Sequence, residues 1–419
     1  MRLYHRPLAF AALTLALALT GCGDSSKPTS PGTATPTPLA TTVETIRARH
    51  GLPALAIAVI GRDSIHVTIR GVRKLGSPAL AQAGDLFHLG SLVKPMTATM
   101  IARLVEAGTL SWDRTLIQAF PEFGDSMVTA YRTVTLRQLL QHRGGFPPFE
   151  TFADFAVLPT FSGSAIEQRR AFVRWLTTRP PAVPPGTYLY SNAGYGVAAA
   201  IAEAAPGSSG DPSITTQPPS GPSWGQLLTT QLLDPLGTTA TLGWPTDHDA
   251  AQPWGHAVVG GSLVPIDPNA GRVPTVVAPA GDLSQSLEAY GRFAQLHLRS
   301  LLGTPQLLSA GTYTLLHTPP AGGDYAMGWQ RLTFQGRLVY THQGSAGTFA
   351  AFVLLDPARG GAYLLATNAL SEGVESAFVE LLTAVIPRSA ALPARYLVAP
   401  AAFRGGLAGP EPTPKFFTK

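Results

Sequence analysis

Apolar residues form short, nearly continuous runs near both ends of the chain. Residues 52–60 (LPALAIAVI) lie between Gly51 and Gly61, and residues 64–71 alternate apolar with polar positions, which predicts two paired strands. Four further strand-like runs follow late in the chain, at residues 325–334, 337–342, 349–355 and 363–367. The short turns between these runs favour antiparallel hairpins.

Helical patterns dominate the chain between the two groups of strands. Helices are expected at residues 43–50, 91–104, 136–143, 168–178, 188–205, 224–236, 283–302 and 372–385. Residues 238–279 are rich in Gly and Pro without a lasting period, which indicates irregular structure. Strands at both ends with helices between them predict an α/β (α+β) fold, in which one antiparallel sheet is covered by helices and flanked by a helical insert.

The first 22 residues have the pattern of an export signal. Arg2 and Arg6 precede an apolar stretch, residues 8–20, that is too short to span a bilayer stably. The sequence then reads Leu-Thr-Gly-Cys and resembles the lipobox of bacterial lipoproteins, which implies a lipid on Cys22, a membrane anchor and an extracytoplasmic location. We therefore expect a leader at 1–21, a Ser/Thr/Pro-rich tether at 22–42, a folded domain at 43–387 and a Pro/Ala-rich tail at 388–419.

Composition narrows the functional classes. With 45% hydrophobic and 13% charged residues, the chain can bury a large core. The formal charge of +5 is spread without Lys/Arg clusters, so nucleic acid is not an expected partner. Cys22 is the only cysteine, which excludes disulfides and Cys-ligated metals, and the histidines show no metal-binding i, i+4 pair. We therefore expect neither a metal nor an organic cofactor.

Ser91 and Lys94 are the first candidates for chemistry. Their spacing places both side chains on one face of the helix predicted to start at Ser91, one turn apart. Lysine is scarce in this chain, and Lys94 lies in an apolar helix, where burial would lower its pKa and make it a base. The alternative is a solvated Ser and Lys on an ordinary amphipathic helix.

Several motifs follow this pair in a distinctive order. FHLGSLVKPMTA, LLQHRGGFP, YLYSNAGYG, APAGDLSQS, YAMGWQ and HQGSAGTFAAFVLLDP together resemble the successive motifs of the serine β-lactamase and D-Ala-D-Ala peptidase superfamily. The resemblance is strongest to the branch of class C β-lactamases, D,D-carboxypeptidases and esterases of that fold, and covers residues 43–386. It implies an acyl-enzyme at Ser91 after Lys94 helps to remove the serine proton.

The later motifs add five residues by the same resemblance. Tyr190 would act as base toward Ser91 and as acid toward the leaving group, and Asn192 would contact the substrate. By the same resemblance, the motif that begins HQGSAG implies substrate-binding positions at His342, Gly344 and Ser345. The Ser345 N–H would complete an oxyanion hole. Taken alone, Tyr190 could instead be a core tyrosine, Asn192 a helix N-cap and His342 an interior strand residue.

Two features leave alternatives open. Ser223 lies in a Gly-x-Ser-x-Gly pattern, but Pro- and Ser-rich residues precede it where a nucleophile elbow needs a strand, so a helix cap is the preferred interpretation.

Gln343 and an apparent insertion at 206–223 depart from the family pattern. The substrate could therefore be a β-lactam, a peptidoglycan peptide or a carboxylester. The alternative function is a non-hydrolytic penicillin-binding or structural lipoprotein.

Cys22→Ala tests the lipid anchor. An expressing bacterium fed labelled fatty acid should incorporate label into the natural sequence, and the substitution should abolish labelling and release the protein from membranes, because the thiol is the acceptor. Ser25→Ala is the matched control and should keep both properties. Unchanged membrane partition in Cys22→Ala would exclude this anchor.

Overall fold

The computed structural model describes residues 38–205, 221–334 and 336–386. The leader, Cys22, most of the predicted tether and the tail lie outside these residues, as does most of the 206–223 insertion. Within the described part, no helix is long and apolar enough to cross a membrane.

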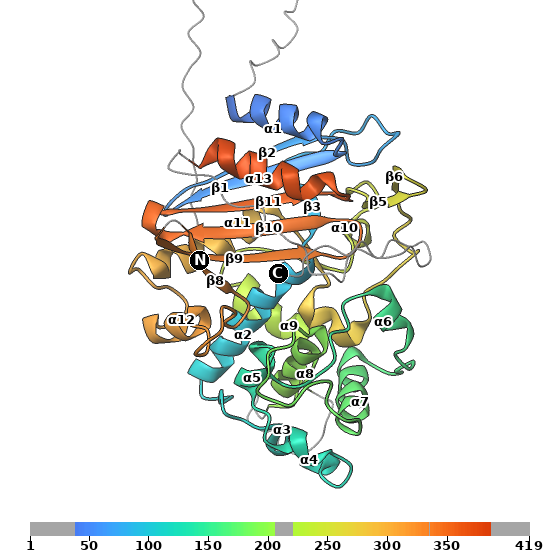
Figure 1. The fold of residues 1–419 in the computed structure, drawn as a ribbon, viewed down its shortest axis with the longest axis vertical. Coiled ribbons are helices and arrows are strands. Elements are labelled where there is room, and N and C mark those ends of the chain that lie inside the picture. The colour runs from blue at the N-terminus through green and yellow to red at the C-terminus, as the bar shows by residue number, and fades with distance from the viewer. Residues whose placement is uncertain (1–37, 206–220, 335, 387–419) are drawn as a thin grey trace, which may run out of the picture. The chain divides into compact units, whose positions relative to one another are not determined.

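A six-stranded antiparallel sheet joins both ends of the chain. Its order is β2-β1-β11-β10-β9-β8 (Figure 1). The strands are β1 (Ala54–Gly61), β2 (Ile65–Gly71), β8 (Gln330–Phe334), β9 (Arg337–Ser345), β10 (Ala350–Asp356) and β11 (Gly361–Thr367). The antiparallel register of β1 on β11 runs from Leu55 opposite Thr367 to Gly61 opposite Gly361. The predicted sheet and fold class are confirmed.

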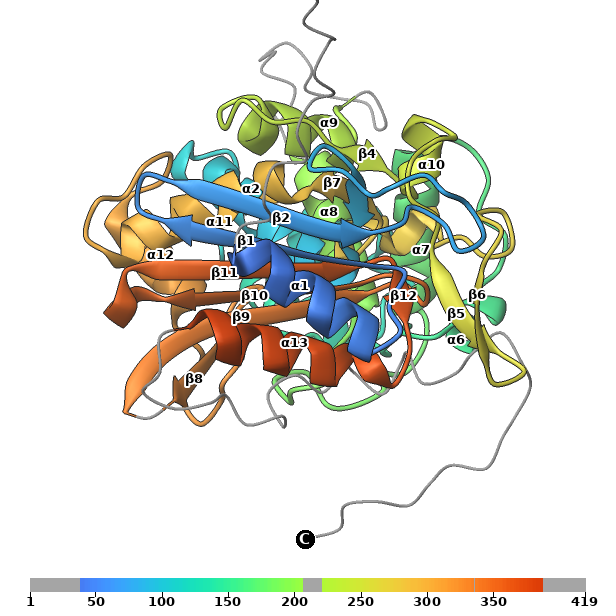
Figure 2. The same ribbon diagram turned by 90° about the horizontal axis from the view of Figure 1, so that it is seen from above.

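Both faces of this sheet are covered by helices. The helices α1 (Pro38–Arg49) and α13 (Gly373–Val385) lie on one face, and α11 (Leu287–Leu301) lies on the other (Figure 2). Leu55 and Ile57 of β1 pack toward the first pair, whereas Ala56 and Ala58 belong to the core on the α11 side. Double burial explains why β1 is a continuous apolar run rather than an alternating one.

A second region of helices surrounds α2 (Val93–Glu106). Eleven of the 14 residues of α2 are buried, so this helix is the central element of the helical region. It packs on α8 (Asn192–Glu203) and on a 3₁₀ segment, η4 (Thr275–Ala280). The other helices described here are α3 (Leu116–Ala119), α4 (Thr129–Arg132), α5 (Leu136–Leu140), α6 (Phe152–Ala156), α7 (Ala165–Thr177), α9 (Trp224–Leu228), α10 (Pro245–His248) and α12 (Ala310–His317).

The helix predicted at 283–302 begins four residues late. β7 (Leu283–Ser286) is instead a strand that pairs with β3 (Leu86–His88) and β4 (Thr241–Leu242). The Ser286 hydroxyl accepts a hydrogen bond from the Ala289 N–H at 3.2 Å, and this N-cap starts α11 at Leu287. The prediction for residues 283–286 was therefore wrong.

Other elements also differ from the expected ones: the helix predicted from residue 188 begins at Asn192, and the one predicted from residue 168 begins at Ala165. α1 begins at Pro38 rather than at residue 43, and proline is well suited to the first turn of a helix. The predicted 136–143 helix ends at Leu140, shortly before His142 adopts a φ of +57°. The region predicted as irregular contains a hairpin, β5 (His256–Val259) and β6 (Ser262–Pro265), whose two-glycine turn has positive φ throughout.

A buried ion pair ties the helical region together. Arg169 of α7 and Glu203 of α8 are 2% and 5% exposed, and the guanidinium Nε donates to both carboxylate oxygens at 3.1 and 2.9 Å. Arg169 also donates to the Thr275 carbonyl oxygen, and Glu203 accepts the Trp224 N–H. One pair of charges therefore connects α7, α8, η4 and the start of α9.

Glu203→Gln should destabilise the fold strongly. Removing one partner leaves the Arg169 charge buried without compensation, which typically costs about 3–5 kcal/mol of unfolding free energy. Urea unfolding followed by circular dichroism measures this loss. Glu122→Gln is the control, because its pair with Arg170 is partly exposed and should contribute about 0–1 kcal/mol. Equal effects of the two substitutions would contradict the structural role of the buried pair.

Candidate active site

Ser91 follows a sharp turn at the end of β3. Gly90 has a φ of +51°, and Ser91 lies in the short 3₁₀ turn η1 (Gly90–Leu92) that leads directly into α2. His88 supports this turn, since its Nδ1 accepts the Gly90 N–H at 3.2 Å and its Nε2 lies 3.1 Å from Asp282 Oδ1. Ser91 is therefore held at the head of the central helix, where it is only 6% exposed.

Lys94 is buried next to this serine. Its Nζ lies 2.8 Å from Ser91 Oγ, 2.7 Å from Asn192 Oδ1 and 2.8 Å from the Ala280 carbonyl oxygen. The side chain is fully buried, and burial lowers the pKa of Lys94 well below the ordinary value of 10.5, while the Glu150 charge opposes this shift. The alternative of a solvated Ser and Lys is wrong.

The hydrogen bonds of Asn192 determine which atoms of Lys94 are available to Ser91. Asn192 Nδ2 donates to the Phe149 carbonyl oxygen at 2.7 Å, so its Oδ1 is left to accept from Lys94. With the Ala280 carbonyl as second acceptor, a neutral amine would use both of its N–H groups and keep its lone pair for the Ser91 hydroxyl. Asn192 is not the helix cap, because Ser191 caps α8 instead.

Tyr190 lies beside Lys94 in an aromatic cluster. The lysine Nζ is 4.7 Å from the Tyr190 ring centroid, and the His142 ring is 4.2 Å from it. Burial raises the pKa of Tyr190 well above 10.0, and the neighbouring Ser91 hydroxyl partly offsets the rise. Among the described residues, the Tyr190 hydroxyl forms no hydrogen bond of normal geometry. It is therefore a neutral phenol whose hydroxyl lies close to Ser91.

His142 lies in the LLQHRGGFP motif, but the sequence did not predict a role for this residue. Its Nδ1 accepts the Ser191 N–H at 3.0 Å, and its carbonyl oxygen accepts the Leu189 N–H at 2.9 Å. Burial and the nearby Lys94 lower the pKa of His142 well below 6.5, so the ring is neutral. His142 thus holds the segment on both sides of Tyr190. Its position in the LLQHRGGFP motif is the signal in the sequence that could have identified it.

His342 lies on β9, behind the strand edge that faces Ser91. Its Nδ1 lies 2.7 Å from the Gln343 carbonyl oxygen, which leaves Nε2 to accept a hydrogen bond from the Tyr325 hydroxyl at 3.1 Å. Burial lowers the pKa of His342 to about 3. Both ring nitrogens are used within the protein, and His342 does not line the pocket beside Ser91. A contact between His342 and substrate stays a prediction.

Gly344 brings β9 against the Ser91 turn. A Cβ at this position would lie 2.1 Å from the Leu89 carbonyl oxygen and 2.7 Å from the Ser91 nitrogen, and a Cβ on Gly90 would lie 2.3 Å from the Ser345 nitrogen. Only glycine permits such an approach of two backbones. The contact places the backbone nitrogens of Ser91 and Ser345 in one region, as an oxyanion hole would require.

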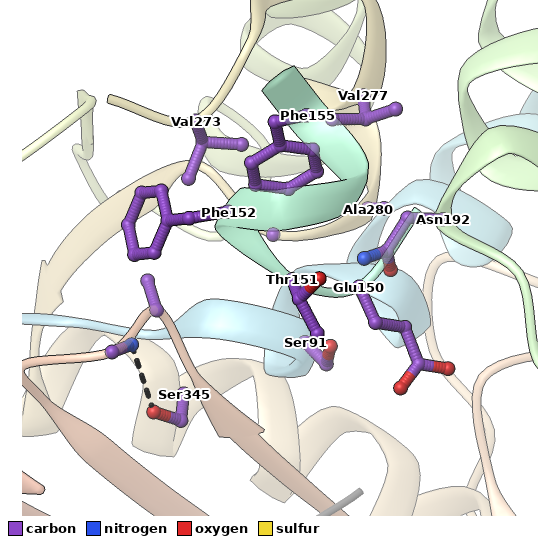
Figure 3. A pocket seen from close by; sticks show the side chains of 13 residues that line it. Ser91, Glu150, Thr151, Phe152, Phe155, Asn192, Val273, Val277, Ala280 and Ser345 are labelled. Atoms are coloured by element: carbon purple, nitrogen blue, oxygen red, sulfur yellow. Dashed lines mark hydrogen bonds between the residues drawn. The ribbon is translucent and has the colours of Figure 1, made fainter. Parts of the chain in front are cut away.

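A pocket opens beside Ser91, with about 510 Å³ of empty space including solvent at its mouth. Asn192, Ser345 and Glu150 contribute polar groups to its wall, and Phe152 and Phe155 contribute aromatic rings (Figure 3). Glu150 is a pocket residue that the motifs in the sequence did not predict. Burial raises the pKa of this carboxyl group, and the Lys94 charge opposes the rise.

Ser223 has a structural role. Its hydroxyl accepts the Gln226 N–H, and the Gln226 side chain accepts the Ser223 N–H at 2.8 Å, which forms a capping box at the start of α9. Residues 221 and 222, the part of the preceding segment that the structure describes, do not form the strand that a nucleophile elbow would need.

Comparisons with known proteins agree with this geometry. Penicillin-binding protein 4 of Amycolatopsis lactamdurans is 27% identical over 352 residues, which cover 80% of this chain and 85% of that protein. The Unguisins hydrolase ungD of Aspergillus violaceofuscus is 27% identical over 342 residues, 73% of this chain but only 56% of that protein. These relatives support a serine hydrolase-type enzyme.

Solved structures share the fold at low identity. The octameric penicillin-binding protein homologue from Pyrococcus abyssi superposes with a TM-score of 0.64 at 20% identity, covering 83% of this chain and 76% of its own. A class C beta lactamase from Rhodobacter sphaeroides gives 0.62 at 18% identity, with 83% and 99% covered. The sequence profile described as Beta-lactamase matches residues 39–385. That match spans the sheet, the Ser91 turn and the helical region, and the chain belongs to the Beta-lactamase family.

Proposed function

We propose that this protein is a hydrolase that forms an acyl-enzyme at Ser91 on an amide or ester substrate. The observation that carries the proposal is the distance of 2.8 Å between Lys94 Nζ and Ser91 Oγ, in a setting where the amine is fully buried. A serine hydroxyl is a weak nucleophile at neutral pH and needs a base within hydrogen-bond reach. Lys94 meets that requirement.

In the acylation step, Ser91 Oγ bonds to the substrate carbonyl carbon and its proton moves to Lys94 Nζ. Negative charge develops on the carbonyl oxygen, and the backbone N–H groups of Ser91 and Ser345 are the proposed donors to it. One such donor typically contributes about 10² to 10³ in rate. The close backbone approach at Gly90 and Gly344 supports this assignment.

Collapse of the tetrahedral intermediate breaks the bond to the leaving nitrogen or oxygen, which must gain a proton. Tyr190 is the proposed donor, because burial keeps it a neutral phenol and its hydroxyl lies next to Ser91. The proton that Lys94 took from Ser91 then restores Tyr190. In the second half-reaction water attacks the acyl-Ser91 ester and gives a proton to the same amine. Lys94 returns this proton to Ser91 Oγ as the bond between the acyl carbon and the serine oxygen breaks, which releases the carboxylic acid and restores the free enzyme.

Location and partners form part of the same proposal. Export and anchoring through Cys22 rest on the leader sequence, and the partner is a small-molecule or peptide substrate. The alternative is a penicillin-binding or structural lipoprotein without turnover. The arrangement of Lys94, Asn192 and Tyr190 around Ser91 favours the enzyme, because it supplies a base for both half-reactions and a proton donor for the leaving group, whereas the alternative needs at most the acylation half.

Ser91→Ala should abolish turnover. The purified protein is assayed with p-nitrophenyl butyrate, a chromogenic cephalosporin and a D-Ala-D-Ala peptide, and the substitution should lower any observed kcat/KM by about 10³-fold or more. Ser223→Ala is the matched control and should keep the activity. Absence of turnover for every substrate, with no fluorophosphonate adduct on Ser91, would contradict the enzyme. A stable penicillin adduct without turnover would favour the alternative.

Glu150→Gln should move the acid limb of the pH profile to lower pH. Lys94 acts as a base only when neutral, so kcat/KM rises as pH passes its pKa. The Glu150 charge raises that pKa, and its removal lowers it, whereas the nearby His142 and His342 rings are already neutral. Initial rates across pH measure the shift. Glu288→Gln, an exposed substitution, should leave the profile in place. An acid limb that stays at the same pH or moves to higher pH in Glu150→Gln would exclude an effect of the Glu150 charge on the Lys94 pKa.

A further inference from the structure

The Glu150 carboxylate faces the pocket without a cationic partner. Glu150 lines the same cavity as Ser91, and Figure 3 shows its side chain near this serine. Within the described part of the chain, this carboxylate takes part in no ion pair and accepts no side-chain hydrogen bond. Its backbone N–H donates to Asp154 Oδ2 at 2.9 Å, and no other hydrogen bond joins Glu150 to the described residues. A partly buried carboxylate without such partners among the described residues can pair with a charged or hydrogen-bonding group of a ligand.

The rest of the pocket supplies no positive charge. Of the described residues that line it, none is Lys, Arg or His. Lys94 lies behind Ser91 and is fully engaged with its three oxygen partners. Arg272, the residue before the pocket-lining Val273, is paired with Asp247 through two hydrogen bonds at 2.5 and 2.9 Å. An anionic substrate would therefore meet a carboxylate and no compensating cation.

Two other features add to the preference for positive charge. The Asp154 carboxylate accepts the backbone N–H groups of Glu150 and Thr151, so a second negative charge lies next to Glu150, outside the pocket lining. Phe152 and Phe155 place aromatic rings on the pocket wall, and a ring face attracts a cation. Carboxylate and aromatic side chains together are the combination that binds an ammonium group.

We propose that Glu150 makes this enzyme selective for esters or amides that carry a cationic nitrogen a few atoms from the scissile carbonyl. This inference rests on the proposed acyl-enzyme chemistry at Ser91 and specifies its substrate class. Glu150 acts as a specificity residue: its carboxylate pairs with the substrate cation and positions the carbonyl over Ser91. Substrates with a free carboxylate at the same distance are rejected by charge repulsion.

Matched pairs of esters test the proposal, because each pair exchanges a quaternary nitrogen for carbon without changing shape. For a cation on the acyl side, the pair is p-nitrophenyl 4-(trimethylammonio)butyrate and p-nitrophenyl 5,5-dimethylhexanoate. For a cation on the alcohol side, it is butyrylcholine and 3,3-dimethylbutyl butyrate. The expected result is a kcat/KM about tenfold higher for the cationic member of at least one pair. The p-nitrophenyl monoester of glutaric acid should be the poorest acyl donor.

Glu150→Gln should reduce that ratio to about one, while Glu150→Asp, which keeps the charge, should retain a preference, and Glu288→Gln should match the natural protein. Because each ratio compares two substrates on one protein, it is insensitive to loss of folded enzyme or to a shift in the Lys94 pKa. Hydrolysis of the neutral esters without a cationic preference, or a preference that survives Glu150→Gln, would overturn the inference and leave the proposed function intact. No hydrolysis of any ester would overturn the inference, and the proposed function would fail with it only if the cephalosporin and the D-Ala-D-Ala peptide were not turned over either and Ser91 formed no fluorophosphonate adduct.

Discussion

The site depends on how the structure satisfies one buried amine. Lys94 is fully buried inside a helix that is itself almost wholly enclosed, so its charged form is disfavoured, and its three hydrogen bonds have to come from fixed oxygens. Two of these oxygens, on Asn192 and Ala280, come from α8 and η4, the elements that pack directly on α2. The third is the Ser91 hydroxyl. The elements that pack the helical region around α2 are therefore also the ones that hold Lys94 next to Ser91.

The sheet supplies the other half of the site through close backbone contact. β9 approaches the Ser91 turn so closely that no side chain fits at Gly344 or Gly90. The strand is held in place by β10, which is buried on both faces between α11 and the α1–α13 pair. The sheet core thereby fixes the distance between Ser91 and Ser345, and the helical region fixes Lys94. Ser91 lies where these two parts of the fold meet.

Much of this arrangement could be predicted from the sequence, because burial leaves a clear pattern. The apolar run in β1 and the spacing of Ser91 and Lys94 are local features, and both predicted their structures correctly. Residues 283–286 were misassigned because a four-residue strand has too short a pattern to compete with the helix that follows, and only the Ser286 cap marks the boundary. Glu150 lies in a Pro- and Phe-rich loop without periodicity, so its place in the pocket follows from tertiary packing alone.

The protonation state of Lys94 tests the central claim most directly. The chain has only five lysines, so labelling lysine with ¹³C and ¹⁵N gives a few side-chain NMR signals, and Lys94→Ala identifies the relevant one. We expect the Lys94 amine to titrate well below 10.5, so that it is neutral at a pH at which an ordinary lysine amine is still charged. A Lys94 signal that remains that of an ammonium group up to the ordinary lysine range would contradict it.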